Sequence, residues 1–166
     1  MNDQNSLSPL YHLDANRVNA RQKDPSVNQL EAWRDEGIIF LEYSLVAYKE
    51  ASYGDTRRAE KADEITWSES VDSIGVESDR KRQIENVIFP SGAHTMAQNN
   101  DVAIVYDAWW AGATLITADG NSKSQPRGIL GSKNALAEIG ISVISTSDAV
   151  LEIQTHIKDI TKQDEI

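Results

Sequence analysis

The stretch from Asn99 to Asp119, NNDVAIVYDAWWAGATLITAD, predicts a helix, a glycine break and then a short buried strand. We expect Asp101 to open the helix and Gly112 to end it, after which the apolar strand runs into Asp119. Open α/β folds bind their ligands at the carboxyl ends of the strands. A strand that ends in a carboxylate therefore indicates a ligand site at this edge, with Asp101 beside Asp119.

Composition narrows the classes of site that the chain can carry. The 166 residues fit one domain with a sizeable core, and the chain contains no cysteine, which excludes disulfides, thiolate zinc sites and thiol catalysis. His12, His94 and His156 share no metal-ligand spacing. The net charge of −10 argues against a broad nucleic-acid surface, because phosphate binding needs clustered Lys and Arg, but it permits a local basic rim around an acidic metal site.

The amino-terminal residues 1–8 are polar, and we expect them to be flexible. The chain has no long apolar run that would predict export or a membrane span. The expected location is therefore the cytoplasm, without membrane association.

Strand and helix signals alternate along the chain. Strands are predicted at Leu10–Leu13, at Ile38–Leu41, before Asp119 and at Ile141–Ile144. Helices are predicted after Pro25, at Leu45–Ala51 with Ser44 as cap, from Asp55 or Thr56, from Asp101, near Lys133–Glu138, and from Asp148 towards Thr161 with Ser147 as cap. The region 56–98 is interpreted as an extended helical region with loops, including a Pro-Ser-Gly turn at residue 90. This order predicts one α/β domain over 1–166, a three-layer α/β/α sandwich with a mainly parallel central sheet.

Acidic residues follow several of these elements at the same expected edge. Asp14 and Asp119 lie at the ends of two predicted strands. The helix that begins after Ser44 carries Glu50 six residues on, and Asp101 lies on the helix before the Asp119 strand. Four carboxylates in one pocket would repel one another unless a hard cation neutralised them, and Mg²⁺ or Mn²⁺ is the natural occupant. The alternative is a purely structural role, in which each acid only caps a helix or a turn.

These motifs resemble the PIN domain, a family of metal-dependent ribonucleases with a three-layer α/β/α fold. Leu13-Asp14-Ala15-Asn16 is similar to the family's first motif, and Ser44 to Glu50 is similar to its second. Asp101 to Gly112 and Thr117-Ala118-Asp119 are similar to its third and fourth. The resemblance spans Leu10 to about Ile153 and implies that Asp14, Glu50, Asp101 and Asp119 are both the catalytic and the metal-binding residues.

The second acid has two candidates. Glu42 lies at the predicted strand end, whereas the spacing from Ser44 favours Glu50. The stretch from Thr56 to Gln98 is longer and more polar than in a minimal PIN domain.

Other residues near the acids are assigned lesser roles. Asp107 falls about 240° around the helix from Asp101 and is expected to be a supporting or solvent residue. Asn16 and Asn121 are interpreted as turn residues, although either could hold a water or phosphate; at least one of Trp109 and Trp110 should pack against the sheet. Two basic runs are expected to be solvated helix faces: the first is Arg57, Arg58 and Lys61, and the second is Arg80, Lys81 and Arg82. Two further basic residues, Lys123 and Arg127, could line the mouth of the site.

The preferred hypothesis is a PIN-like ribonuclease that hydrolyses RNA phosphodiester bonds with Mg²⁺ or Mn²⁺. The resemblance also implies a possible antitoxin-like protein inhibitor and a possible homodimer. The alternative is a catalytically inactive PIN-like binding or scaffold protein. A phosphatase or receiver-type domain is a weaker third reading, because the chain has no Asp-x-Asp-x-Thr motif and no phosphate-binding Gly-rich loop.

Overall fold

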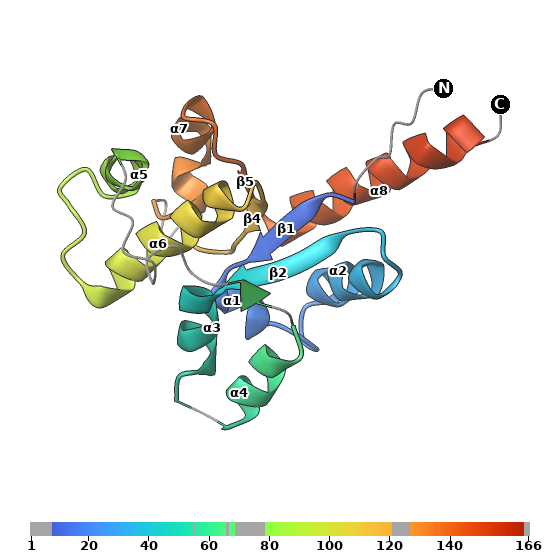
Figure 1. The fold of residues 1–166 in the computed structure, drawn as a ribbon, viewed down its shortest axis with the longest axis horizontal. Coiled ribbons are helices and arrows are strands. Elements are labelled where there is room, and N and C mark those ends of the chain that lie inside the picture. The colour runs from blue at the N-terminus through green and yellow to red at the C-terminus, as the bar shows by residue number, and fades with distance from the viewer. Residues whose placement is uncertain (1–7, 55, 66, 69–78, 121–126, 165–166) are drawn as a thin grey trace.

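The computed structural model describes residues 8–54, 56–65, 67–68, 79–120 and 127–164. Strands and helices alternate along these residues (Figure 1). In chain order they are β1 Leu10–Leu13, α1 Ala15–Val18, α2 Pro25–Asp35, β2 Phe40–Ser44, α3 Leu45–Ser52, α4 Thr56–Asp63, β3 Trp67–Ser68, α5 Asp79–Ile88, α6 Met96–Trp110, β4 Thr114–Ile116, the 3₁₀ turn Leu130–Ser132, α7 Lys133–Glu138, β5 Val143–Ile144 and α8 Thr146–Asp164.

The described strands form one parallel sheet in the order β3-β2-β1-β4-β5. Leu10 pairs with Phe40, and Tyr11 pairs with Thr114, so β1 lies between β2 and β4. From β1 the chain builds outward through β2 to β3, and it then returns to add β4 and β5 on the other side. The strand order therefore reverses at β1, and such a switch point is where open parallel sheets bind ligands.

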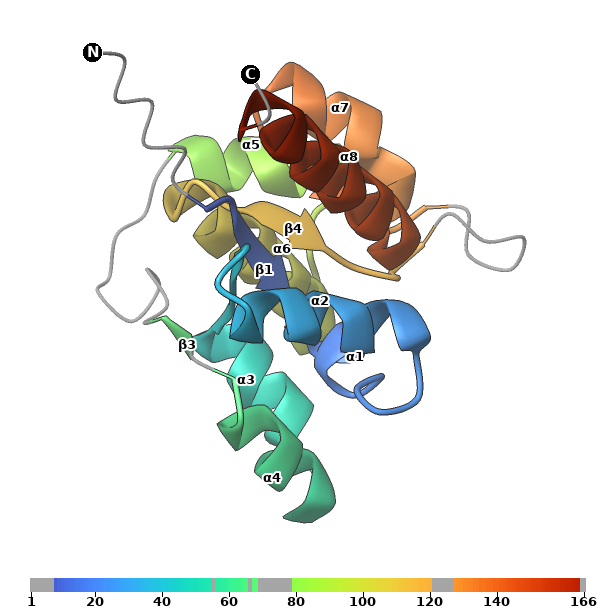
Figure 2. The same cartoon turned by 90° about the vertical axis from the view of Figure 1, so that its right-hand side faces the viewer.

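Helices cover both faces of the sheet, which makes the fold a three-layer α/β/α sandwich. Figure 2 shows α2 and α8 in front of the strands and α6 behind them. On the face covered by α2 and α8, the Tyr11 hydroxyl on β1 donates to Glu152 on α8 at 2.8 Å. On the other face α6 contributes the buried run Val102–Ala108 to the core. The predicted fold class is confirmed.

Two predicted strands begin later than expected. The second is β2 at Phe40–Ser44 rather than Ile38–Leu41, because Gly37 has a positive φ of 74° and Ile38 still donates to the Trp33 carbonyl. The last is β5 at Val143–Ile144. The helix start at Pro25 and the cap at Ser44 were predicted correctly: α2 begins at Pro25, after the N-cap Asp24, and Ser44 Oγ accepts from Ala47 N at 3.3 Å.

Two predicted helix starts were wrong. Asp101 does not open α6, which begins at Met96 with a capping box between Thr95 and Gln98. The final helix begins at Thr146, and Ser145 Oγ rather than Ser147 accepts from the Asp148 amide at 3.1 Å. In both places a hydroxyl residue earlier in the chain than the predicted cap accepts a hydrogen bond from a free amide of the first turn.

In its described part the region 56–98 contains α4, the short strand β3, α5 and the first residues of α6, and β3 was not predicted. Residues 66 and 69–78 lie outside the described part. The turn after residue 89 is confirmed, because Gly92 N donates to the Phe89 carbonyl at 2.8 Å. Among the residues that the structure describes, no helix combines the length and apolarity needed to cross a membrane.

Candidate functional site

Asp14 and Thr117 meet at the switch point between β1 and β4. The Asp14 amide extends the ladder by donating to the Ile116 carbonyl at 2.9 Å. Its carboxylate Oδ2 accepts from Thr117 Oγ1 at 2.5 Å and from Asn16 Nδ2 at 2.7 Å. The side chains of Asp14 and Thr117 are both buried. The ends of the two central strands are therefore tied together by polar side chains.

Asp119 is held at the same edge by its own backbone and by the chain that returns after residue 126. Its amide donates to Thr117 Oγ1 at 2.9 Å, so this hydroxyl connects Asp14 and Asp119. Oδ2 of Asp119 accepts from Ile129 N at 2.9 Å, and the Asp119 carbonyl accepts from Leu130 N at 2.8 Å. Thr117 was noted in the sequence only as part of Thr-x-Asp, and its bridging role emerges from the structure.

Two glycines make this close return possible. Gly120 has a φ of 86°, and a Cβ there would lie 1.8 Å from the Arg127 carbonyl oxygen. Gly128 has a φ of 92°, and a Cβ there would lie 2.6 Å from Asp119 Oδ2. Only glycine fits both the backbone conformation and the available space at these positions.

Glu50 and Asp101 project from the helices α3 and α6, which pack against each other. Glu50 lies in the second turn of α3, and among the described residues its buried Oε2 has no hydrogen-bond partner. Asp101 lies in the second turn of α6 and is half-buried. The sequence prediction placed both residues on the correct helices, although it wrongly had Asp101 open α6.

The four acids interact electrostatically, and every pair among them contributes. Burial raises the pKa of Asp14, the Thr117 hydrogen bond opposes this, and the charge of Asp119 raises it further. Burial, then Asp14 and Asp119, raise the pKa of Glu50. Burial, then the charges of Asp119, Asp14 and Glu50, raise the pKa of Asp101 from its ordinary 3.8 to about 7. Such mutually raised pKa values are typical of functional carboxylate sites.

The donor set fits a hard divalent cation, but the acids are not drawn together into a cage. In the described part of the chain, no group of three or more His, Asp or Glu side chains is arranged to hold a metal ion. Mg²⁺ usually keeps several waters and binds through only one or two carboxylates, so a cage is not required. The partnerless Oε2 of Glu50 and the unfavourable charge at Asp101 are features that a cation would relieve.

Glu42 lies within β2 and not at the strand end where it was predicted. It is the middle residue of β2 and pairs in register with His12 on β1. Its Oε2 is 3.9 Å from His12 Nε2, but burial lowers the pKa of His12 to about 4, so the imidazole is neutral at neutral pH and the contact is not an ion pair. Of the two glutamates, Glu50 is the one coupled to the other acids.

The supporting residues differ partly from expectation. Asp107 is only 3% exposed. Of its two predicted roles, the solvent-exposed one is therefore wrong. Asn16 lies in α1 and accepts from the Ala118 amide at 3.3 Å in addition to its bond to Asp14. Trp109 packs against the hydrophobic core, whereas Trp110 is 56% exposed. Packing of either one on the sheet stays a prediction.

The basic residues have distinct positions. Arg57 and Arg58 are exposed on α4, whereas Lys61 Nζ donates to the Arg21 carbonyl at 3.1 Å. Arg80 is not a solvated residue, because its guanidinium lies 4.9 Å from the Trp109 ring centroid and donates to the Ile139 carbonyl. Arg127 lines the pocket described next. Asn121 and Lys123 lie outside the described residues.

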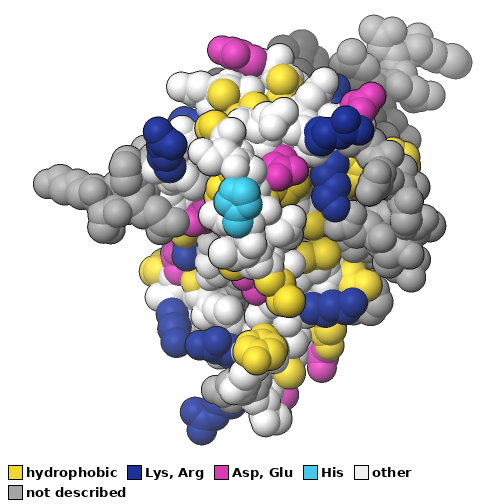
Figure 3. All heavy atoms as spheres, turned by 90° about the vertical axis from the view of Figure 1, so that its left-hand side faces the viewer, with side chains coloured by type: hydrophobic (Ala, Val, Ile, Leu, Met, Phe, Trp, Pro, Cys, Tyr) yellow, Lys and Arg dark blue, Asp and Glu magenta, His cyan; other side chains and the backbone are white. Residues whose placement is uncertain are grey.

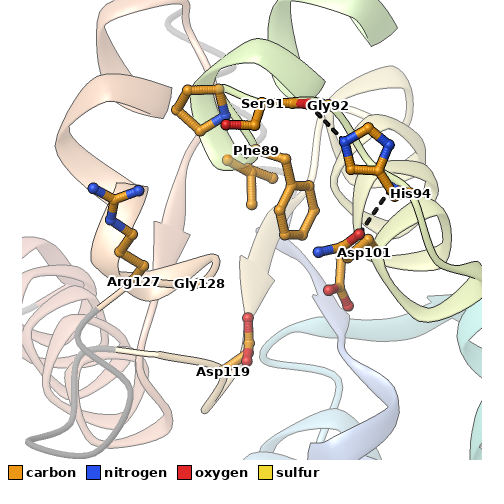
Figure 4. A pocket seen from close by; sticks show the side chains of 11 residues that line it. Phe89, Ser91, Gly92, His94, Asp101, Asp119, Arg127 and Gly128 are labelled. Carbon is orange, nitrogen blue, oxygen red and sulfur yellow. Dashed lines mark hydrogen bonds between the residues drawn. The ribbon is translucent and has the colours of Figure 1, made fainter.

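A pocket of about 420 Å³ opens beside Asp101 and Asp119. Figure 4 shows the Phe89 ring in its middle, with His94 and Asp101 on one side and Arg127 on the other. The pocket is lined by Ile88, Phe89, Pro90, Ser91, Gly92, His94, Gln98, Asp101, Asp119, Arg127 and Gly128. Local sequence patterns predict the turn at residue 90 but not its place in this wall, because the wall forms where α5 packs on α6.

Comparison with known proteins adds no assignment. No protein-family model matches the chain, and no curated protein matches it either.

Proposed function

We propose that the chain is a PIN-like, metal-dependent ribonuclease in which Asp14, Glu50, Asp101 and Asp119 hold Mg²⁺ or Mn²⁺. The observation that carries the proposal is the mutual electrostatic coupling of these four acids at the switch point of a parallel sheet. Their order along the chain and their supporting elements agree with the PIN resemblance.

Each acid would have a role that follows from its surroundings. Asp14, fixed by Thr117 and Asn16, is the most rigid ligand. Asp101 and Asp119 both line the pocket, so either could contact the ion and the substrate together. Glu50, on α3, would supply the fourth negative charge of the site. A bound divalent ion makes a water molecule a stronger nucleophile towards phosphorus and stabilises the leaving oxygen.

The surface around the site supports an anionic polymer as substrate despite the net charge of −10. Figure 3 shows Lys and Arg side chains at several places on the face over α5 and α6, interspersed with acidic side chains. Neutralising phosphates with Lys and Arg is the main source of sequence-independent nucleic-acid affinity. An antitoxin-like inhibitor and a homodimer remain predictions from the family resemblance.

A second candidate is a PIN-like binding protein that does not cleave. The hydrogen bond from Ile129 N to Asp119 Oδ2 favours it, because this oxygen already accepts from the backbone without an ion.

The test is cleavage of a mixed RNA pool with Mn²⁺, with EDTA as the metal-free control. Asp14→Asn and Asp119→Asn should each lower the cleavage rate at least about a hundredfold, while Asp159→Asn, which changes an exposed acid on α8, should leave it unchanged. Cleavage that persists in both site variants would contradict the proposal. Mn²⁺ binding without cleavage would favour the non-cleaving protein.

A further inference from the structure

We propose that the pocket between α5, α6 and the Arg127–Gly128 segment binds one nucleobase of the substrate RNA, next to the phosphate at the acids. The inference rests on the proposed function and adds the part of the substrate that this chain reads. Phe89 is the proposed stacking residue, and the turn that follows it forms the outer wall.

The size and lining of the pocket suit a flat aromatic ligand. Its volume of about 420 Å³ lies within the range of roughly 300–1,000 Å³ that is typical of small-molecule sites. Ile88, Phe89 and Pro90 supply an apolar wall with one aromatic ring. Stacking on an aromatic side chain is the main way in which proteins hold unpaired bases.

The wall is held rigid before any ligand binds. Phe89 N donates to the Glu85 carbonyl at 2.7 Å, and the Phe89 carbonyl accepts from Gly92 N at 2.8 Å. Glu85 Oε1 also accepts from Ala93 N at 2.8 Å, and Gln98 Oε1 accepts from His94 N at 2.8 Å. A preformed pocket lowers the ordering cost of binding, which favours recognition of one base among several.

The polar groups are placed for a nucleotide rather than for an apolar side chain. Asp101 and Asp119 belong both to this pocket and to the four-acid site, so a base in the pocket carries its phosphate towards the acids. Arg127 stands on the opposite side from Asp101 and can meet a phosphate oxygen (Figure 4). The Ser91 hydroxyl can both donate to and accept from a base edge, and Gln98, whose Oε1 accepts from the His94 and Thr95 amides, can donate through Nε2.

The direct experiment measures binding of the four 5′-nucleoside monophosphates to the full chain in EDTA, by amide NMR titration. At least one nucleotide should bind saturably and shift the amides of Phe89, Gly92 and Gln98. Phe89→Leu keeps the apolar contact but removes the ring, and it should weaken this binding about tenfold, whereas Phe89→Tyr should stay within about twofold. Phe40→Ala is the matched control, because Phe40 is 54% exposed at the amino end of β2, away from the acids.

The inference is overturned if no nucleotide binds saturably, if the shifted amides lie elsewhere, or if Phe89→Leu binds as well as the unchanged protein. An equal loss in Phe40→Ala overturns it as well. Metal-dependent cleavage with an unchanged kcat/KM and product pattern in Phe89→Leu contradicts this pocket assignment alone. Nucleotide binding at Phe89 without metal-dependent cleavage contradicts the ribonuclease proposal alone.

Discussion

Replacing Asp101 by asparagine should stabilise the metal-free protein at pH 8. Burial and the charges of Asp119, Asp14 and Glu50 disfavour the ionised carboxylate in the folded state, which raises its pKa from 3.8 to about 7. Because the unfolded chain keeps the lower pKa, folding costs nothing extra below pH 3.8. The cost then grows as the pH rises and is complete above pH 7. Asparagine carries no charge and avoids this cost.

The magnitude follows from the pKa difference of about 3. A pKa difference of one corresponds to about 1.4 kcal/mol, so the upper limit is roughly 4 kcal/mol. Asp101 is only half-buried, and solvent screening reduces such values by at least half. We therefore expect Asp101→Asn to raise the free energy of unfolding by about 1–2 kcal/mol at pH 8, or Tm by roughly 3–6 °C.

The assay is thermal and chemical denaturation in EDTA at pH 4 and pH 8, with Asp159→Asn as the exposed control. The stabilisation should be present at pH 8 and nearly absent at pH 4. A destabilised Asp101→Asn protein at pH 8, or an equal gain at both pH values, would refute the electrostatic reasoning.

Three further outcomes are expected. Because burial lowers the pKa of His12 from 6.5 to about 4, the contribution of His12 to stability should fall by about 3 kcal/mol as the pH drops from 6.5 to 4, opposite in sign to that of Asp101. Denaturation of His12→Phe should lose this acid-side fall, and an unchanged pH profile would contradict the reasoning. Gly120→Ala should destabilise the protein by at least about 2 kcal/mol and weaken Mn²⁺ binding, because its Cβ would meet the Arg127 carbonyl. Gly112→Ala is the control: Gly112 has a φ of 69° but open space around it, so the substitution should cost only about 1 kcal/mol. Equal losses of stability in the two variants, measured by denaturation, would count against the close return. Mn²⁺ affinity, measured by calorimetry, should fall about tenfold for each pH unit below 7, because Asp101 must lose a proton, and pH-independent binding would exclude it as a ligand.

Local patterns in the sequence were enough to predict the fold class and the elements that carry the acids. β1 and the helix after Ser44 have strong local signals, an apolar run before an acid and a hydroxyl cap. Parallel order then follows from the alternation of strands and helices. Asp101 was misplaced because the capping box at Thr95 and Gln98, a signal present in the sequence, was overlooked.

Other features depend on contacts between distant segments. The Thr117 hydroxyl bridges Asp14 and Asp119 only because β1 and β4 are neighbours in the sheet. The pocket wall at Phe89 exists because α5 packs on α6, and no local pattern encodes that contact. Burial of His12 between two core positions of β1 likewise emerges only from the completed sandwich.

Diffraction at the manganese anomalous edge, from crystals soaked in Mn²⁺, tests the four-acid metal site most directly. We expect an anomalous peak within ligand distance of a carboxylate oxygen of Asp14, Glu50, Asp101 or Asp119. No peak among the four acids at saturating Mn²⁺ would contradict the assignment.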